Sequence, residues 1–369
     1  MAFAPEPASQ TARGTARQSA PVPHLASLGL AAPVIDLAQD DVARYGADLF
    51  ATTHGGFDRL APIYKNAEIE SRHTCTPIPW FLQPHSFSER NDLFLKHAVA
   101  LLREAAEKAL NAAGLKPSDI DAVVTVSSTG IATPGLDARL MEVMDFRRDL
   151  QRLPVFGLGC AGGVIGLARA AALAKAEPES RVLFLVVELC SLTFRHADRS
   201  KSNLVATALF GDGAAAAVVS CRPEYADTPK LGPWGEHTWP DSLDVMGWEV
   251  ADDGLKVIFS RDIPSLVAED LRPVVEAFLA RHGASLDDID GFVCHPGGAK
   301  VLDALEATFG LPPRGLTHAR DVLRDHGNMS AVTVMYVLDA TMAAGARGRQ
   351  LMTTLGPGFT AGLMVVEIA

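Results

Sequence analysis

Three side chains whose types could carry out acyl transfer lie in short glycine-containing motifs. They are Cys160 in GLGCAGG, His295 in VCHPGG and Asn328 in HGNMS. A cysteine thiolate can take an acyl group from a thioester, and a nearby imidazole can accept the thiol proton. An amide can donate a hydrogen bond to a developing oxyanion without losing a proton. The three types together predict covalent acyl transfer through Cys160, followed by decarboxylative formation of a carbon–carbon bond.

Each of these residues also has a structural interpretation. Cys160 could be a buried thiol of the core, His295 a hydrogen-bonded structural imidazole, and Asn328 a plain helix N-cap. The flanking glycines allow a sharp turn at Cys160, and the Pro-Gly-Gly turn ends the predicted strand at His295, which favours the functional interpretation. Cys294 lies one residue earlier on that strand, so it should point the opposite way, into the core.

The elements that must position these residues are predicted by an internal repeat. The segment EKALNAAGLKPSDIDAVV, from Glu107, is similar to EAFLARHGASLDDIDGFV, from Glu276, at an offset of 169 residues. A second pair of segments, from Leu158 and from His326, matches at an offset of 168 residues. The glycine turn after Phe210 has a counterpart after Leu355. Two matches in the same order predict a duplication of one helix–strand–helix–strand unit.

The repeat predicts an α/β protein with a thiolase-like, five-layered αβαβα fold made of two halves related by a pseudo-twofold axis. Ala-rich helices at about 161–175 and 329–344 should be buried between two sheets, because they are apolar nearly all round. Cys160 and Asn328 occupy equivalent positions at the starts of these helices. We therefore expect them to meet at the centre, where the helix N-terminus favours the thiolate of Cys160.

Composition excludes several classes of protein. The 369 residues carry a formal net charge of -11 and show no basic stripe, which argues against nucleic-acid binding. Five cysteines without a CxxC pair predict neither a disulfide framework nor a metal site, and indicate a reducing cytoplasm. No apolar run approaches the ~18 residues of a membrane span, so we expect no integral membrane association. Residues 1–24 are typical of a disordered tail, followed by halves at 25–222 and 223–369.

The motifs GCAGG, ALFGDGAAA, CHPGG, GNMS and LGPGFT resemble those of the chalcone/stilbene synthase-like family of type III polyketide synthases, from about Leu25 onward. The resemblance implies that Cys160 carries the acyl chain, while His295 and Asn328 catalyse decarboxylation and condensation. It makes Phe210 a gatekeeper between the active site and a CoA tunnel. It also implies a homodimer that uses acyl-CoA and malonyl-CoA and needs no cofactor, metal or carrier protein.

The same resemblance assigns further residues to the pocket. Trp248 stands where plant enzymes carry Gly, Val257 where they carry Phe, and Thr133 where a Met reaches across the dimer interface. The other expected pocket residues are Ser128, Cys190, Thr193 and Ser330, and the loop that shapes cyclisation is Gly356, Pro357 and Gly358. The expected contacts to CoA are Arg59, Lys65 and Lys300, because an anionic ligand needs cations at the tunnel mouth.

The departures from the plant pattern favour a bacterial-type enzyme that extends a fatty acyl-CoA to an alkylpyrone or alkylresorcinol. Malonyl-primed synthesis of a hydroxynaphthalene or phloroglucinol is the main alternative. A ketosynthase III that stops after one condensation has the same fold and the same Cys/His/Asn set. A binding module on a degenerate thiolase fold and a Cys/His/Asn hydrolase are more distant alternatives, since the intact residues argue against the first and the duplication against the second.

Overall fold

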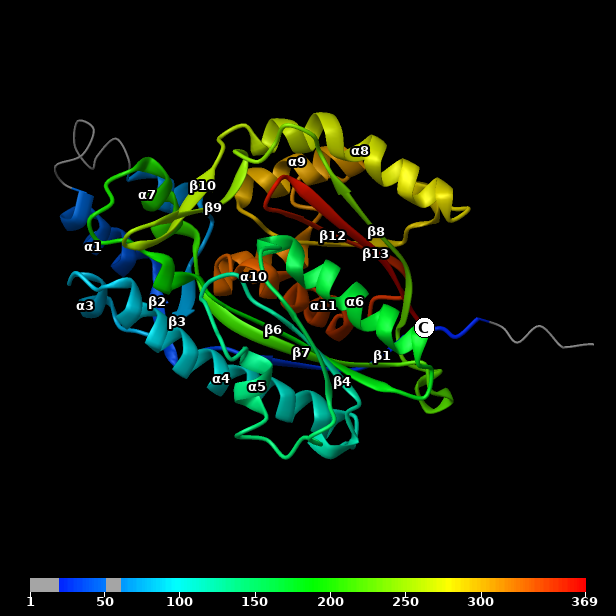
Figure 1. The fold of residues 1–369 in the computed structure, drawn as a ribbon. Coiled ribbons are helices and arrows are strands. Elements are labelled where there is room, and N and C mark those ends of the chain that lie inside the picture. The colour runs from blue at the N-terminus through cyan, green and yellow to red at the C-terminus, as the bar shows by residue number, and fades with distance from the viewer. Residues whose placement is uncertain (1–19, 51–60) are drawn as a thin grey trace, which may run out of the picture.

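Residues 20–50 and 61–369 are described in a computed structural model (Figure 1). Most of the predicted N-terminal tail and the predicted CoA ligand Arg59 therefore lie outside the described residues. Within the described ranges, no helix has both the length and the apolar character needed to cross a membrane.

Two sheets build the frame of the molecule. In spatial order the first contains β5 (Gln151–Val155), β4 (Ala122–Val126), β6 (Arg181–Leu189), β7 (Asp212–Ser220) and β1 (His24–Ala31). The second contains β8 (Lys230–Thr238), β13 (Thr360–Ile368), β12 (Gly348–Gly356) and β11 (Gly291–Cys294). Strands β1 and β8 pair at one residue pair, His24 with Lys230. This single pair joins the two sheets into one sheet of nine strands.

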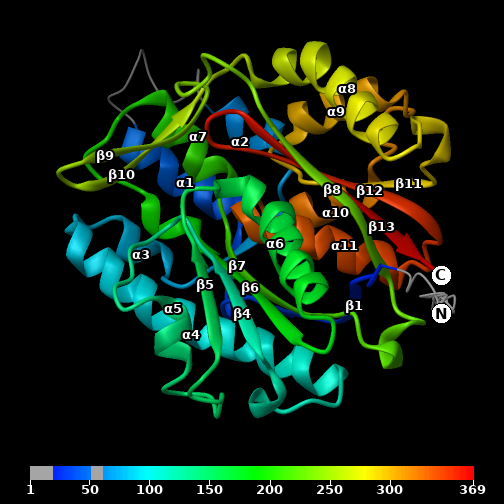
Figure 2. The ribbon, with the colours of Figure 1, turned by 45° about the vertical axis from the view of Figure 1, so that its right-hand side comes forward.

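Helices fill the three other layers. Helices α6 (Gly162–Ala176) and α11 (Thr333–Ala343) lie between the sheets, which confirms the two buried helices and the five-layered fold (Figures 1 and 2). Helices α4 (Phe87–Ala112) and α5 (Leu136–Leu140) cover the outside of the first sheet, and α8 (Ile263–Arg281) and α9 (Ala299–Phe309) cover the second (Figure 1). A Cβ atom at Gly163 would collide with the backbone of Ala331, so glycine permits the close approach of α6 to the segment before α11.

The repeat is visible as matched local structure. Helix α4 leads through the 3-10 turn Pro117–Asp119 to β4, and α8 leads through the turn Leu286–Asp288 to β11. Gly114 and Gly283 follow the two helices with φ of 68° and 70°, the left-handed conformation that favours glycine. In both turns an aspartate accepts a backbone N–H three residues earlier at 2.8 Å. The two halves thus share their capping chemistry as well as their order of elements.

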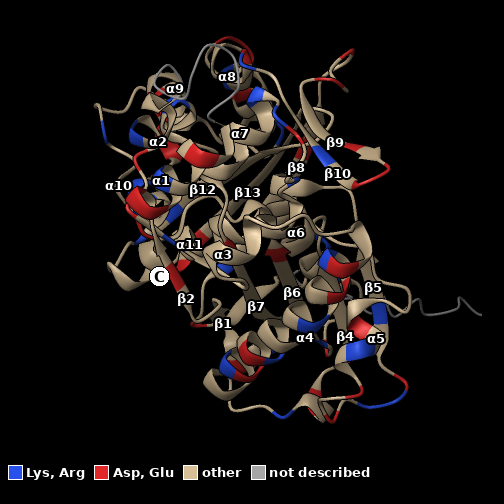
Figure 3. Ribbon diagram, turned by 90° about the vertical axis from the view of Figure 1, so that its left-hand side faces the viewer, with Lys and Arg blue, Asp and Glu red and all other residues tan. Residues whose placement is uncertain are grey.

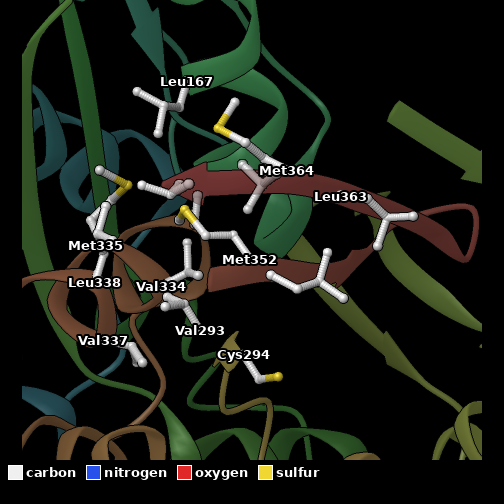
Figure 4. Packing of buried hydrophobic residues seen from close by; sticks show 14 of the residues in the cluster. Leu167, Val293, Cys294, Val334, Met335, Val337, Leu338, Met352, Leu363 and Met364 are labelled. Atoms are coloured by element: carbon white, nitrogen blue, oxygen red, sulfur yellow. The ribbon is translucent and has the colours of Figure 1, made fainter. Parts of the chain in front are cut away.

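The core lies where the central helices meet the sheets. Figure 4 shows side chains of β11, β12, β13 and α11 interleaved, including Met352, Met364 and Val334, all fully buried. Cys294 belongs to this core, as its place on the strand predicts. The charged residues lie mostly on the outer helices and turns (Figure 3). Continuous apolar strands such as β6 fit because helices cover both faces of each sheet.

The remaining elements lie around one end of the two sheets (Figure 2). They are β2 (Ile35–Ala38), α1 (Gln39–Phe50), α2 (Pro62–Asn66), β3 (Ser71–Thr74), α3 (Ile78–Phe81), α7 (Lys201–Leu209), β9 (Met246–Ala251), β10 (Gly254–Phe259) and α10 (Thr317–His326). Strands β9 and β10 form a separate two-stranded hairpin, and β2 pairs with β3 in another two-stranded sheet. All of them except α10 contribute residues to the cavities described next.

Candidate active site

Cys160 lies in a single 3-10 turn, Gly159–Ala161, that leads into α6. Its thiol is 8% exposed and donates to the hydroxyl of Ser330 at 3.6 Å. Gly159 has a φ of 45°, and its backbone N–H donates to the Ser128 hydroxyl at 3.0 Å. A Cβ atom on Gly159 would lie 2.6 Å from the ring of Pro357. The glycine therefore allows the loop at 356–358 to pack directly against the turn that carries the thiol.

His295 follows the last residue of β11, and its backbone N–H donates to Thr353 on β12 at 2.9 Å. The ring is 4% exposed, and neither ring nitrogen has a hydrogen-bond partner among the described residues. A buried histidine with a structural role is normally hydrogen-bonded. The unpartnered nitrogens of His295 are therefore available to a substrate or to the thiol.

Asn328 is fixed by both its backbone and its amide. Its backbone N–H donates to Leu209 at 2.8 Å, beside an isolated β-bridge to Phe210. The side-chain NH2 group donates to the Gly297 carbonyl at 3.1 Å, and the side-chain oxygen accepts the Ser330 N–H at 2.8 Å. The amide caps the turn before α11 through its oxygen and keeps a second N–H that can serve as an oxyanion donor.

The structure brings the three residues together. Cys160, His295 and Asn328 line one cavity of about 320 Å³, which we call the outer cavity. Cys160 also lines a second cavity of about 30 Å³, the inner cavity, with Cys190, Phe210, Trp248, Val257, Ser330 and Pro357. Thiol, imidazole and amide thus face one space, with a small apolar recess beside the nucleophile.

Burial controls the protonation of the two titratable groups. It raises the pKa of the Cys160 thiol to about 12, against a smaller lowering by the Ser330 hydrogen bond, and the nearby Glu188 charge raises this pKa further. Burial also lowers the pKa of His295 to about 3. Taken alone, each group is neutral, whereas the sequence led us to expect that the helix N-terminus favours the thiolate of Cys160. His295 lines the same cavity with unpartnered ring nitrogens and is the candidate acceptor of the thiol proton, because the opposite charges of a thiolate–imidazolium pair would stabilise each other.

Replacing His295 with glutamine should therefore slow alkylation of Cys160 by iodoacetamide at pH 7 by about 10- to 100-fold. In H295Q the thiol keeps the pKa that burial raises to about 12, so the rate should rise about tenfold per pH unit between pH 7 and 10. The native protein should reach a plateau at lower pH. The absence of that plateau in the native protein would exclude the charged pair before substrate binds.

Glu188, at the end of β6, is a fully buried carboxyl next to the nucleophile. Its Oε2 accepts the Ser128 N–H at 2.9 Å and the Thr129 hydroxyl at 2.8 Å, while its Oε1 has no partner among the described residues. Burial raises the pKa of Glu188 to about 7, despite these hydrogen bonds. Sequence analysis missed this residue because an apolar strand around a single Glu gives no sign of its neighbours.

Glu188→Gln tests this ionisation through stability. A carboxyl whose pKa is raised on folding stabilises the protein below its unfolded pKa, and that contribution disappears as pH rises through about 7. Between pH 4.5 and 7.5 the free energy of unfolding of the variant should rise relative to that of the native protein, by about 3 kcal/mol at most. Urea unfolding of both proteins at several pH values measures the difference. A pH-independent difference would show that Glu188 ionises normally.

Three basic side chains line the outer cavity: Lys201, Arg261 and Lys300. All three are exposed, so they lie at the rim. The structure thus places the expected Lys300 at the mouth and adds Lys201 and Arg261, which the sequence did not single out because they lie far apart along the chain. Lys65 is exposed and does not line this cavity, although its neighbours Asn66 and Ala67 do.

Six of the predicted pocket residues line the inner cavity. They are Cys190, Phe210, Trp248, Val257, Ser330 and Pro357. Ser128 lies behind Cys160 as a hydrogen-bond partner of Gly159, Gly358 donates its N–H to Met246 at 3.1 Å, and Gly356 packs against Leu158 and Ala161. Thr133 is exposed, next to a cis Pro134 peptide bond, and lines none of the cavities described here.

A third cavity of about 80 Å³, the apolar cavity, lies beyond the inner one. It shares Cys190 and Phe210 with the inner cavity and is also lined by Thr193. Its other apolar side chains come from α1, α3 and α7 and include Leu49, Phe81 and Ala206. Phe210 thus borders the inner and apolar cavities and does not line the outer cavity that carries the three cations.

The sequence matches two family descriptions, "Chalcone and stilbene synthases, N-terminal domain" over residues 81–223 and the corresponding C-terminal domain over residues 236–368. The chain belongs to the chalcone and stilbene synthase family. This synthase is 41% identical to a putative chalcone synthase of Bacillus subtilis, over 92% of this chain and 97% of the relative. It is 38% identical to a 1,3,6,8-tetrahydroxynaphthalene synthase of Streptomyces peucetius, over 93% and 92% of the two chains.

A solved structure supports the same family assignment. The crystal structure of 1,3,6,8-tetrahydroxynaphthalene synthase from Streptomyces coelicolor, a bacterial type III polyketide synthase, superimposes with a TM-score of 0.88 at 27% identity, over 93% of this chain and 99% of that one. The protein is therefore a type III polyketide synthase, an acyl-transferring enzyme with a thiolase-like fold. This assignment decides between that class and the ketosynthase III, hydrolase and binding-module alternatives.

Proposed function

We propose that this synthase loads a fatty acyl group from a CoA thioester on Cys160 and extends it with malonyl-CoA to an alkylpyrone or alkylresorcinol. The observation that carries the proposal is the apolar cavity beyond the inner one. Nearly all of its lining surface is apolar, and Cys190 and Phe210 form part of its wall on the side of Cys160. An alkyl chain gains free energy by leaving water for such a space, at about 0.8 kcal/mol per CH2 group.

Loading follows from the pairing of thiol and imidazole. Proton transfer to His295 gives the Cys160 thiolate, which attacks the carbonyl carbon of the acyl-CoA. The second N–H of Asn328 and the protonated His295 are the available donors to the oxyanion. The carbon–sulfur bond to CoA breaks, and His295 protonates the leaving CoA thiolate.

Extension uses the same donors on the second substrate. Loss of CO2 from malonyl-CoA leaves its electron pair as a thioester enolate, whose oxygen is stabilised by Asn328 and His295. The enolate carbon attacks the Cys160 thioester, a carbon–carbon bond forms, and the Cys160 thiolate is released. The product is a β-ketoacyl-CoA longer by two carbons, which can reload for another cycle.

The rim of the outer cavity supports CoA thioesters as the substrates. Lys201, Arg261 and Lys300 offer three positive charges to the CoA phosphates, in a protein whose net charge is -11. The 320 Å³ of the outer cavity leads from that rim to the three catalytic candidates. No cofactor or metal is needed for these steps, and an odd number of free cysteines fits a reducing cytoplasm.

Homodimer formation is proposed from an exposed apolar surface. Ile131, Leu153 and Phe156 are 48%, 37% and 59% exposed, and Thr133 follows Ile131 closely in sequence. Leu153 belongs to β5, the last strand of the nine-stranded sheet, whose outer edge is unpaired among the described strands. Light scattering should report a dimer for the native protein, and a monomer for Phe156→Asp would support this surface.

Replacing Ala206 with leucine tests the apolar cavity. Ala206 is 6% exposed and lines this cavity, so three added carbon atoms should occupy much of its 80 Å³. The longest accepted acyl-CoA should become shorter, with kcat/KM for long starters falling about tenfold or more, as the lost burial of two or more CH2 groups implies. Short starters serve as the internal control. Equal losses for short and long starters would point to general damage instead.

The experiment that tests the proposed function uses radiolabelled malonyl-CoA with acyl-CoA starters of increasing length, and with no starter. Products are resolved by mass. Masses that follow the starter would support fatty acyl priming. A single product independent of the starter would establish malonyl priming, and no product that depends on Cys160 would overturn both.

Malonyl-primed synthesis of a hydroxynaphthalene is the second candidate. It is favoured by the relatives named 1,3,6,8-tetrahydroxynaphthalene synthase, at 38% and 33% identity. The small inner cavity, with Trp248 opposite Val257, would suit a short starter. Phloroglucinol formation from the same priming would give a smaller product, which the mass measurement separates.

A further inference from the structure

The β9–β10 hairpin lines the inner cavity. It belongs to neither main sheet (Figure 1). Trp248 on β9 pairs with Val257 on β10, and both side chains line the inner cavity. Trp248 also packs edge-on against Phe210, with ring centroids 6.5 Å apart. Because no ladder of the main sheets holds this hairpin, other contacts must determine how far its wall stands from Cys160.

The turn of the hairpin is held by an ion pair. Arg195 donates through Nε to Asp253 Oδ1 at 2.8 Å, with Nη2 at 2.5 Å from the same oxygen. Arg195 is itself oriented by Asp198, at 3.0 Å, and its side chain is 14% exposed. The carboxylate of Asp253 is 43% exposed, so water and salt can reach the pair from one side only.

Arg90 links the same turn to a second segment of the inner-cavity wall. This residue of α4 is 4% exposed, and its Nη2 donates to the backbone carbonyl of Asp253. Its Nη1 donates to the carbonyl of Phe194 at 2.8 Å. Phe194 follows the 3-10 turn Cys190–Thr193, whose first residue also lines the inner cavity. One guanidinium therefore fixes the two segments relative to each other.

We propose that Arg90, Arg195 and Asp253 form a clamp that sets the number of malonyl extensions by fixing the hairpin wall of the inner cavity. None of the three lines the outer, inner or apolar cavity, so they are positioning residues. The inner cavity of about 30 Å³ has little room beside the thioester, and a small displacement of the hairpin changes that room by a large fraction. The inference rests on the proposed function of Cys160 as the chain-carrying thiol.

The test compares Asp253→Asn and Arg195→Ala with the native enzyme under one starter. The ratio of products differing by one malonyl extension should shift by about three- to fivefold, the upper range for breaking a partly exposed ion pair. Lys256→Ala is the matched control, because the ion pair of Lys256 with Glu249 at 2.8 Å joins β10 to β9 within the hairpin. This control should leave the ratio unchanged.

A conservative variant separates positioning from general stability. Asp253→Glu keeps a carboxylate that Arg195 can bind and should hold the product ratio near the native value, whereas Asp253→Asn should not. Salt of about 0.5 M should shift the native ratio toward that of Asp253→Asn, because it screens the exposed side of the pair. A lowered melting temperature with an unchanged product ratio would overturn the clamp.

Fluorescence gives a readout that does not depend on turnover. The contribution of Trp248 is obtained by subtracting the emission of Trp248→Phe variants, and its quenching by acrylamide should increase at least about twofold when Asp253→Asn frees the hairpin. Unchanged quenching in the clamp variants would also contradict the proposal. Failure of the proposed function would appear separately, as the absence of products dependent on Cys160 in the native enzyme.

Discussion

Replacing Cys160 with alanine is expected to abolish polyketide formation, with a loss of at least about 10⁴-fold, comparable to removing the nucleophile of other covalent enzymes. No other thiol can substitute. Cys190 also lines the inner cavity, but burial raises the pKa of its thiol well above the usual range, and it does not line the outer cavity with His295. Product formation is followed with radiolabelled malonyl-CoA and a fatty acyl-CoA.

The same variant should keep part of its malonyl-CoA decarboxylation, because the enolate needs donors and not the thiol. His295 and Asn328 remain in the outer cavity, and the Asn328 amide is held by Gly297 and Ser330, whose backbones the substitution does not touch. Release of labelled CO2 measures this step. Equal loss of decarboxylation and condensation would mean that Cys160 acts on malonyl-CoA as well. Persistent condensation would remove Cys160 from the mechanism.

Replacing Asn328 with alanine should produce the second largest effect. In the proposed mechanism the amide is the fixed neutral donor to the enolate oxygen, so its loss should slow decarboxylation and condensation by about 10²- to 10³-fold. Loading of the starter on Cys160 should fall less, because a protonated His295 still faces that oxyanion. Rapid-quench mass spectrometry separates acylation of Cys160 from extension.

The control for this variant is Ser330→Ala. Ser330 accepts the Cys160 thiol at 3.6 Å and donates its backbone N–H, not its hydroxyl, to Asn328. The alanine variant therefore keeps the orientation of the Asn328 amide and should retain decarboxylation. A loss as large as that of Asn328→Ala would show that the hydroxyl, and not the amide, stabilises the enolate. Circular dichroism must show that both variants keep the native secondary structure.

The internal repeat could be found in the sequence, and it predicted most of the fold. Local signals in the sequence predicted the helix ends at Gly114 and Gly283, the two DID turns and the apolar strands. These features depend on the backbone freedom of glycine and on burial of both faces of a strand, which nearby residues determine. Equivalence of Cys160 and Asn328 at an offset of 168 residues was enough to predict that they meet. The structure places both on the outer cavity with His295.

Tertiary structure alone decided what surrounds those three residues. Lys201 and Arg261 reach the rim from elements distant in sequence, whereas Lys65 does not line the outer cavity. Glu188 lies near Cys160 because β6 packs against α6. The protonation of Cys160 could not be read from its motif, since a helix N-terminus is a local feature whereas desolvation depends on every atom that closes the cavity. Local signals thus fixed the fold and the reacting groups, and long-range packing fixed their charge state, the cavity volumes and the clamp at Asp253.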